Sequence, residues 1–285
     1  MFLDLETAEP RFVIPSNFRR RVSRVRLRKL LMTGIDVNWG KTVSGFKPVE
    51  NGISVSFTDG TEVQGSLLAA ADGSGSKIRQ LLVGKELGRL NHLPAHFLAV
   101  TVRLAEEKVI RLPGLDSSKL QGSHPDTGYY MWYSILSTPE VNGSSRTDSP
   151  FYEAQFDFSW LVHGPEDDMP PTNAGRLAKI KSLASAGTGF QKTLRDAVES
   201  IPDDTEVLEF NLSDWPIVPW HGFDGRVTLL GDAAHPMTMC AWPPLSTGLE
   251  SLHLPWIAIT NRCTPQIAVK LRVMGSQTLQ ISCSN

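Results

Sequence analysis

Cysteine, net charge and long apolar runs are all scarce in this chain of 285 residues, and each shortage argues against a class of protein. The three cysteines form neither an even set nor a cluster, which argues against a disulfide framework or a cysteine metal site and favours a reducing, cytoplasmic location. A formal net charge of −2 gives no sign of a nucleic-acid partner. No apolar run approaches the length of a membrane span, and the first residues lack the pattern of a secretory signal.

Against this background, one stretch stands out because a carboxylate directly follows a short apolar run. Val227–Leu230 reads as a buried strand that Gly231 breaks, so Asp232 stands at the carboxyl end of a strand, where open α/β sheets bind ligands. Its carboxylate can accept hydrogen bonds from sugar hydroxyls. Ala233 and Ala234 are small enough for a ligand to lie close to the backbone. Alone, such a stretch would be read as an ordinary strand end with a capping aspartate.

A second stretch of the same kind lies about 160 residues upstream. Leu67–Ala71 is another short apolar run, and Asp72 and Gly73 follow it. Next comes a predicted helix start, for which Ser74 or Ser76 supplies the capping hydroxyl. Two such strand ends in one chain favour a nucleotide site over two unrelated caps.

Together the two stretches resemble the fingerprints of the single-component FAD-dependent monooxygenases, the flavin aromatic hydroxylases with a p-hydroxybenzoate hydroxylase-like fold. The first follows the family pattern Asp-Gly-x-x-Ser-x-apolar-Arg through Arg79. The second follows Gly-Arg-Val-x-Leu-x-Gly-Asp-Ala-Ala-His-Pro-Met through Met237, as in fungal members. The resemblance implies an α/β (α+β) fold: an incomplete FAD/NAD(P)-binding Rossmann-like domain with an inserted antiparallel-sheet substrate domain.

The resemblance also implies an activity and a cofactor site. NADH or NADPH would reduce bound FAD, which would then use O2 to hydroxylate an aromatic or polyketide-like small molecule. Asp232 would hold ribityl or ribose hydroxyls of FAD, and Asp72 would act near the pyrophosphate. Arg24 would neutralise phosphate charge, and Pro236 would pack beside the flavin ring. The other candidates for cofactor binding are Gly73, Arg79, Gly231, Ala233 and Ala234. The sequence assigns no catalytic residue and no metal ligand.

Arginine is concentrated in Asn17–Met32, and three interpretations of this segment compete. It could be a nuclear-import or nucleic-acid patch, a solvated helix face, or the Arg-x-x-Leu-Arg helix of the resembled family. The rest of the chain offers no second basic surface. The third interpretation is therefore preferred for Arg24, and the remaining arginines are assigned to solvent.

The resemblance, together with changes in composition along the chain, implies four parts. We expect a partial FAD-binding domain at 1–90, a substrate domain at 91–214, a return to the FAD-binding domain at 215–240 and an atypical tail at 241–285. Residues 1–15 read as irregular. Strands are predicted at Gly34–Trp39, Gly52–Phe57, Glu62–Ala70, Phe97–Leu104, Gly128–Leu136 and Phe151–Val162, and helices at Asn173–Ser185 and Gln191–Ser200.

The aromatic strands of the substrate domain allow two interpretations. Within Phe151–Val162, apolar and polar residues alternate from Tyr152 to Trp160, which predicts a half-buried antiparallel sheet with one polar, solvated face. Gly128–Leu136 carries Trp132 within a run of aromatic residues. Such side chains could line a pocket for a planar substrate, but aromatic strand faces are more often plain core, and core packing is preferred for each of them.

Two departures from the family pattern weaken the expected activity. No Gly-x-Gly-x-x-Gly turn occurs in the chain, so a set of pyrophosphate donors worth about 1.5–3 kcal/mol each is missing. The match also stops after Met239, and we hypothesise that the Trp-Pro-Pro tail derives from an altered reading frame or a retained intron. FAD retention and activity are therefore expected to be weak, unless another chain supplies the missing half of the flavin domain. The alternatives are a catalytically inactive remnant acting as a binding module, and a related epoxidase or reductase.

Overall fold

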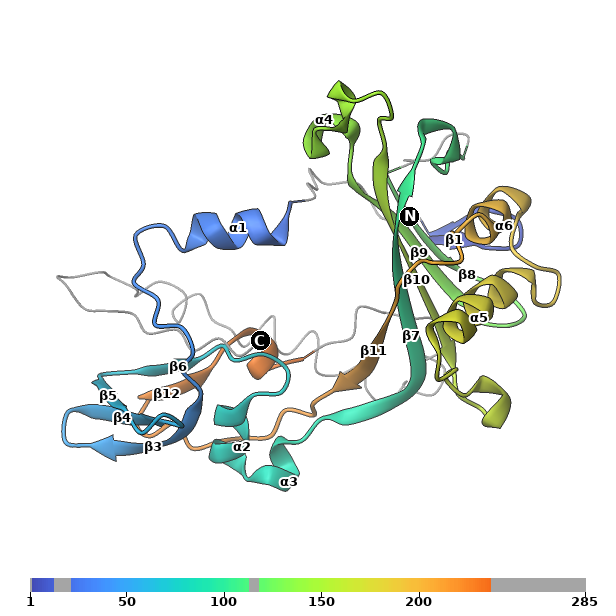
Figure 1. The fold of residues 1–285 in the computed structure, drawn as a ribbon. Coiled ribbons are helices and arrows are strands. Elements are labelled where there is room, and N and C mark those ends of the chain that lie inside the picture. Colours follow the sequence, from blue (N-terminus) through green and yellow to red (C-terminus); the bar gives the residue numbers. More distant parts are fainter. Residues whose placement is uncertain (1, 13–21, 113–117, 237–285) are drawn as a thin grey trace. The chain divides into compact units, whose positions relative to one another are not determined.

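The computed structural model describes residues 2–12, 22–112 and 118–236, which belong to two compact units (Figure 1). The sheet unit comprises residues 2–12 and the described part of Leu93–Leu212. The motif unit comprises Val22–His92 and residues 213–236. The tail at 241–285 and residues 17–21 of the arginine-rich segment lie outside the described residues.

The sheet unit is built on seven strands in the order β11-β7-β10-β9-β8-β1-β2. Neighbouring strands β7 to β10 pair antiparallel, as predicted, whereas β1 pairs parallel with β8. Residues 1–15 are predicted to be irregular, but two strands form there, of which β2 is the edge strand and β1 lies between β2 and β8. The strands are β1 (Phe2–Asp4), β2 (Pro10–Phe12), β7 (Asn91–Leu104), β8 (Lys119–Ser123), β9 (Tyr130–Ser137), β10 (Tyr152–Leu161) and β11 (Val207–Asp214).

Two helices, α5 (Asn173–Ser185) and α6 (Lys192–Glu199), cover one face of this sheet (Figure 1). The predicted apolar stripe of α5 is confirmed, because its buried residues are Leu177, Ile180, Leu183 and Ala184. The helix cap is Thr172, not the predicted Asn173, because the Thr172 hydroxyl accepts from Gly175 N at 3.1 Å. The unit also contains α4 (Pro139–Asn142) and the 3-10 turns η1 (Glu106–Lys108), η2 (Ser144–Arg146) and η3 (Pro165–Asp167).

Under the helices, the core of the sheet unit contains a fully buried tyrosine. The ring of Tyr133 lies 4.9 Å from that of Phe156, and its hydroxyl accepts from Ile110 N at 3.4 Å. Burial disfavours the phenolate and raises the pKa of Tyr133 to about 12, although the hydrogen bond from Ile110 opposes the shift.

This shift predicts that the sheet unit loses stability in alkali. The pKa of Tyr133 in the fold exceeds the value of about 10 for an unfolded tyrosine, so its stabilisation is complete below about pH 10 and is lost as the pH rises toward 12. We expect the free energy of unfolding to fall by about 2 kcal/mol between about pH 9 and about pH 12, measured by urea denaturation. Tyr133→Phe should flatten that part of the pH profile; an unchanged slope would contradict the assignment.

The motif unit contains two small sheets. Strands β3 (Val43–Val49), β4 (Gly52–Phe57) and β5 (Glu62–Gly65) form an antiparallel meander, and β6 (Leu68–Ala70) pairs parallel with β12 (Val227–Leu229). The predicted turn between β4 and β5 is confirmed: Gly60 has φ +83°, and Thr61 N donates to Asp59 Oδ1 at 3.0 Å. The helical segments are α1 (Arg24–Leu31), α2 (Lys77–Val83), α3 (Lys85–Gly88) and the 3-10 turn η4 (Gly231–Ala233).

The predicted strand at Gly34–Trp39 is wrong. The strand of this region is β3, which pairs with β4 from Val43 to Val49 despite the unfavourable Gly45 and Pro48. Residues 34–39 have apolar alternation but no partner strand among the described residues, and Trp39 is exposed. Pairing across a short turn therefore outweighed local propensity. None of the helices in the described ranges is long and apolar enough to cross a lipid bilayer.

Candidate functional site

The two predicted strand ends lie side by side in the motif unit. Strands β6 and β12 are parallel neighbours, with Ala70 opposite Leu229, and Leu230 N donates to Ala70 O at 2.8 Å. Asp72 follows β6 and Asp232 follows β12, so both loops leave the same edge of this two-stranded sheet. We refer to them as the Asp72 loop (71–76) and the Asp232 loop (230–236).

The Asp72 carboxylate is largely engaged in shaping its own loop. It accepts hydrogen bonds from the Ser76 hydroxyl at 2.6 Å, from Lys77 N at 2.8 Å and from Ile78 N at 3.3 Å. Of the two predicted caps, Ser74 and Ser76, the helix uses Ser76, whose hydroxyl accepts from Arg79 N at 2.9 Å. Gly73 has φ +81°, a conformation that favours glycine. The carboxylate thus fixes the path of the chain from β6 into α2.

Arg79 joins the Asp72 loop to the Asp232 loop. Its side chain is fully buried and donates to backbone carbonyls: Nε to Gly88 O at 3.0 Å, Nη1 to Ala233 O at 3.0 Å and Asp232 O at 3.5 Å, and Nη2 to Ser74 O. Burial lowers the pKa of the Arg79 guanidinium, and the Asp72 charge opposes that shift. The sequence predicts that Arg79 binds the cofactor. In the structure, its guanidinium donates hydrogen bonds to backbone carbonyls of the protein itself.

Trp215 packs against Arg79, although the sequence does not identify it as part of the site. The Arg79 guanidinium lies 4.9 Å from the centre of the Trp215 ring. The indole N–H of Trp215 donates to Leu87 O at 2.6 Å. The sequence offered one clue, a tryptophan upstream of the Gly-Asp motif. It could not reveal that Trp215 packs against Arg79, because these two residues lie far apart in the chain.

The Asp232 loop presents its carboxylate outward. Gly231 has φ +58°, and a Cβ at this position would meet no atom within 4 Å. Asp232 is exposed, and its carboxylate forms no hydrogen bond or ion pair with any residue in the described ranges. Ala233 and Pro236 are buried, and Ala234 is half-buried. The backbone of the loop is therefore anchored while one acceptor group remains open to a ligand.

Arg24 is not joined to these loops by any contact of the described chain. It is the first residue of α1, a helix without buried residues, and its side chain forms no hydrogen bond or ion pair with another described residue. Arg28 of the same helix lies 5.1 Å from the centre of the Trp39 ring. The structure thus brings together Asp72, Arg79 and Asp232, but not Arg24.

Beside the Asp72 loop is a pocket of about 660 Å³. Arg79 forms part of its wall, and the exposed side chains of Arg89 and His92 contribute polar groups. Its lining is Gly75, Arg79, Gln80, Arg89, Leu90, Asn91 and His92. The lining residues all belong to the motif unit, and Gly75 connects the pocket to the Asp72 loop.

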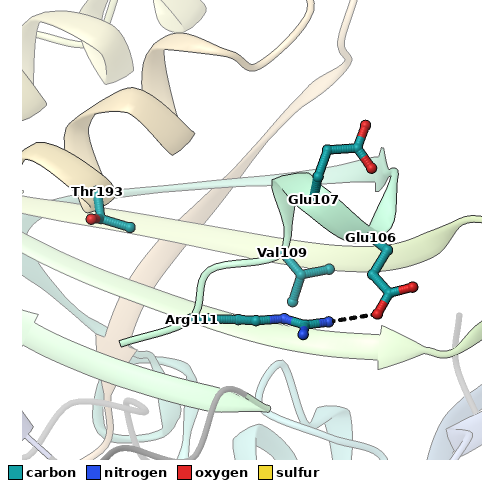
Figure 2. A pocket seen from close by; sticks show the side chains of 5 residues that line it. All are labelled: Glu106, Glu107, Val109, Arg111 and Thr193. Carbon is teal, nitrogen blue, oxygen red and sulfur yellow. Dashed lines mark hydrogen bonds and ion pairs between the residues drawn. The ribbon is translucent and has the colours of Figure 1, made fainter. Parts of the chain in front are cut away.

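A second pocket, of about 530 Å³, lies in the sheet unit and contains none of the predicted site residues (Figure 2). Arg111 points toward Glu106 and forms an ion pair with it at 3.0 Å, while Glu107 points away (Figure 2). The remaining lining residues are Val109 and Thr193. In the described ranges, no group of three or more histidine, cysteine or acidic side chains could hold a metal ion.

Sequence comparison finds clear relatives among fungal proteins. The chain is 46% identical over 240 residues to the FAD-dependent monooxygenase dbaB of Emericella nidulans. The aligned region covers 83% of this chain and 60% of that protein. It is 32% identical over 237 residues to the FAD-dependent monooxygenase cctM of Talaromyces islandicus, covering 82% and 56%. The chain therefore spans a little over half the length of these relatives. No protein-family model matches it.

Solved structures support the fold. An FAD-containing monooxygenase structure from Photorhabdus luminescens superposes with a TM-score of 0.57 at 22% identity, covering 77% of this chain and 58% of that one. HpxO of Klebsiella pneumoniae, solved with FAD and uric acid, gives a TM-score of 0.50 at 20% identity, covering 75% and 48%. The mixed sheet-and-helix architecture of this chain agrees with both.

Proposed function

Because this chain belongs to the family of FAD-dependent monooxygenases, we propose that its Asp72 and Asp232 loops bind FAD. The wider activity we propose is hydroxylation of an aromatic or polyketide-like small molecule with NAD(P)H and O2. When bound, FAD supplies the redox and oxygen-activating chemistry, and the chain supplies binding and orientation. The observation that carries the proposal is the exposed Asp232 carboxylate on a loop whose carbonyls are held by Arg79.

The residues of the Asp232 loop fit the hydroxyl-bearing part of such a cofactor. A carboxylate accepts hydrogen bonds from sugar or ribityl hydroxyls, and Asp232 is free to do so among the described residues. The open space at Gly231 lets a ligand approach the backbone. The half-buried Ala234 adds a small side chain beside it, whereas Ala233 and Pro236 are buried, and contact of these two residues with FAD stays a prediction.

Asp72 and Arg79 have positioning roles in this proposal. Asp72 holds the start of α2 through Lys77 N and Ile78 N, so its effect on a pyrophosphate would be exerted through the loop that includes Gly73. Arg79 gives its donors to carbonyls, so it would orient Asp232 and not contact the cofactor. For Arg24, binding to phosphate stays a prediction.

We further propose that the nicotinamide reductant approaches along the pocket beside the Asp72 loop. The exposed guanidinium of Arg89 offers charge for an anionic phosphate there, and its ion pair with Glu86 is long, at 3.5 Å. The choice between NADH and NADPH, and the cytoplasmic location, stay predictions.

The central test is whether the purified full chain binds FAD and whether Asp232 is responsible. We expect weak binding, because the sequence contains no glycine-rich pyrophosphate turn. Asp232→Asn should weaken it further by about 10–150-fold, the equivalent of charge-assisted hydrogen bonds worth about 1.5–3 kcal/mol. The measurement is quenching of flavin fluorescence during titration, together with an absorbance spectrum of the purified protein.

The matched control is Asp224→Asn, which neutralises another exposed aspartate of the motif unit and should leave FAD affinity unchanged. Equal affinity in wild type and Asp232→Asn would remove Asp232 from the site. If the folded wild-type chain does not quench flavin fluorescence at all, the alternative of an inactive binding module is favoured.

A further inference from the structure

The guanidinium of Arg79 is held at its edge by hydrogen bonds and across its face by an aromatic ring. Its N–H groups donate to backbone carbonyls, two of which, Asp232 O and Ala233 O, belong to the Asp232 loop. Such bonds lie near the plane of the group and leave its faces open. The Trp215 ring lies against the guanidinium, with 4.9 Å between the guanidinium carbon and the ring centre.

The Trp215 ring is itself fixed. It retains 4% of its accessible surface and packs in the core of the motif unit. Its indole N–H donates to Leu87 O at 2.6 Å, and the next carbonyl, Gly88 O, accepts from Arg79 Nε at 3.0 Å. Trp215 and Arg79 therefore hold neighbouring carbonyls at the end of α3, and neither side chain can turn without disturbing the other.

The Asp232 loop depends on this pair of side chains for its orientation. Its 3-10 turn η4 has only three residues, and the turn is closed by Ala234 N and His235 N, which donate to Gly231 O at 2.9 Å and 3.0 Å. The bond from Arg79 Nη1 to Ala233 O, at 3.0 Å, ties this turn to α2. A tilt of the peptide planes at Asp232 and Ala233 would redirect the exposed carboxylate of Asp232.

We propose that Trp215 is a positioning residue for the Asp232 loop. Its ring fixes the plane of the Arg79 guanidinium, and the guanidinium in turn fixes the direction in which the Asp232 carboxylate points. The consequence for FAD binding rests on the proposed function and deepens it, because a residue outside both loops then controls how well the carboxylate meets the hydroxyls of the cofactor.

The first measurement needs no flavin. In NMR spectra of the full chain, the Nη hydrogens of Arg79 should give separate signals, because a guanidinium held by carbonyls and by a ring rotates slowly. Trp215→Leu should merge these signals. The amides of Ala234 and His235, which close η4, should then exchange with solvent about tenfold faster through local opening of the turn.

The matched control is Phe57→Leu, which shortens another buried aromatic side chain of the same core. The Phe57 ring lies 5.7 Å from Lys41 Nζ, on the meander and not beside Arg79. This variant should destabilise the motif unit, yet keep the Arg79 signals separate and the exchange of η4 unchanged. Equal acceleration of η4 in Phe57→Leu and Trp215→Leu would reduce Trp215 to a core residue and overturn the inference.

Trp215→Phe removes the indole N–H but keeps an aromatic face, so the Arg79 signals should stay separate. Merged signals in this variant or in wild type would contradict a role for the ring. These two spectra decide the matter even if Trp215→Leu fails to fold.

The second measurement is a double-mutant cycle on FAD affinity, followed by quenching of flavin fluorescence. Trp215→Leu should weaken FAD binding about tenfold in the wild-type chain but less than about twofold in the Asp232→Asn background, because the carboxylate charge is then absent. Additive losses would show that Trp215 does not act through Asp232. If the wild-type chain binds no FAD, the proposed function fails, whereas the signals of Arg79 and the exchange of η4 still test the positioning role.

Discussion

Replacing Arg79 with methionine should lower the free energy of unfolding of the motif unit by about 3–5 kcal/mol. Methionine fills similar space but donates no hydrogen bond, so Gly88 O and Ala233 O lose their partner. The stacking of the guanidinium on Trp215 is lost as well. Since the residue is fully buried, water cannot readily replace these contacts.

Hydrogen exchange of peptides that contain β6 and β12 is the appropriate measurement, because it reports on the motif unit by itself. Arg89→Met is the matched control: that arginine is exposed and forms only a long ion pair, so the cost should stay below about 0.5 kcal/mol. If Arg79→Met proved as mild as Arg89→Met, the guanidinium would not be the link between the two loops.

A loss of similar size is expected in the sheet unit when Phe156 is replaced by alanine. The side chain has no exposed surface and lies 4.9 Å from the Tyr133 ring and 6.4 Å from the Phe158 ring, measured between ring centres. Truncation leaves a cavity under α5 and α6, and such changes cost about 3–5 kcal/mol.

The effect of Phe156→Ala should appear as faster exchange in peptides of β9 and β10, with a lower midpoint in urea unfolding. Phe151→Ala provides the comparison, because this half-buried ring lies before β10 and contacts Arg103 at 4.7 Å, outside the main core. It should cost much less. Comparable losses in both variants would mean that the core under the helices is not the main source of stability.

Local sequence patterns predicted a useful part of this molecule. The apolar stripe of α5, the turn at Asp59–Gly60 and the strand β10 all depend on residues close together in the chain, and all are confirmed. The side-by-side arrangement of the Asp72 and Asp232 loops could also be anticipated, because two short apolar runs that end in aspartate are typical of parallel strands.

What could not be predicted depends on partners distant in sequence. The strand β8 (Lys119–Ser123) has no apolar alternation, and it forms because β9 and β1 pair with it. The motif predicts a cofactor-binding role for Arg79, and nothing in its spacing reveals that the carbonyls of Asp232 and Ala233 accept its hydrogen bonds. The alternation along β10 predicts that Asp157 and Ser159 face solvent, but both are buried. Alternation shows which residues share the second face of a strand, and it does not show whether that face is covered.

The parallel pairing of β1 with β8 has a consequence for how the chain matures. Phe2 lies opposite Phe12 of β2 and opposite Gln121 of β8, so β1 can pair with β2 early but must wait for about 120 further residues to be synthesised before its parallel partner exists. Until then Phe2 can pack only against Phe12 of β2, and the rest of the surface that Phe2 and Leu3 bury in the sheet unit stays in water. Closure of such a long loop is entropically costly, so the pairing of β1 with β8 should form late in folding.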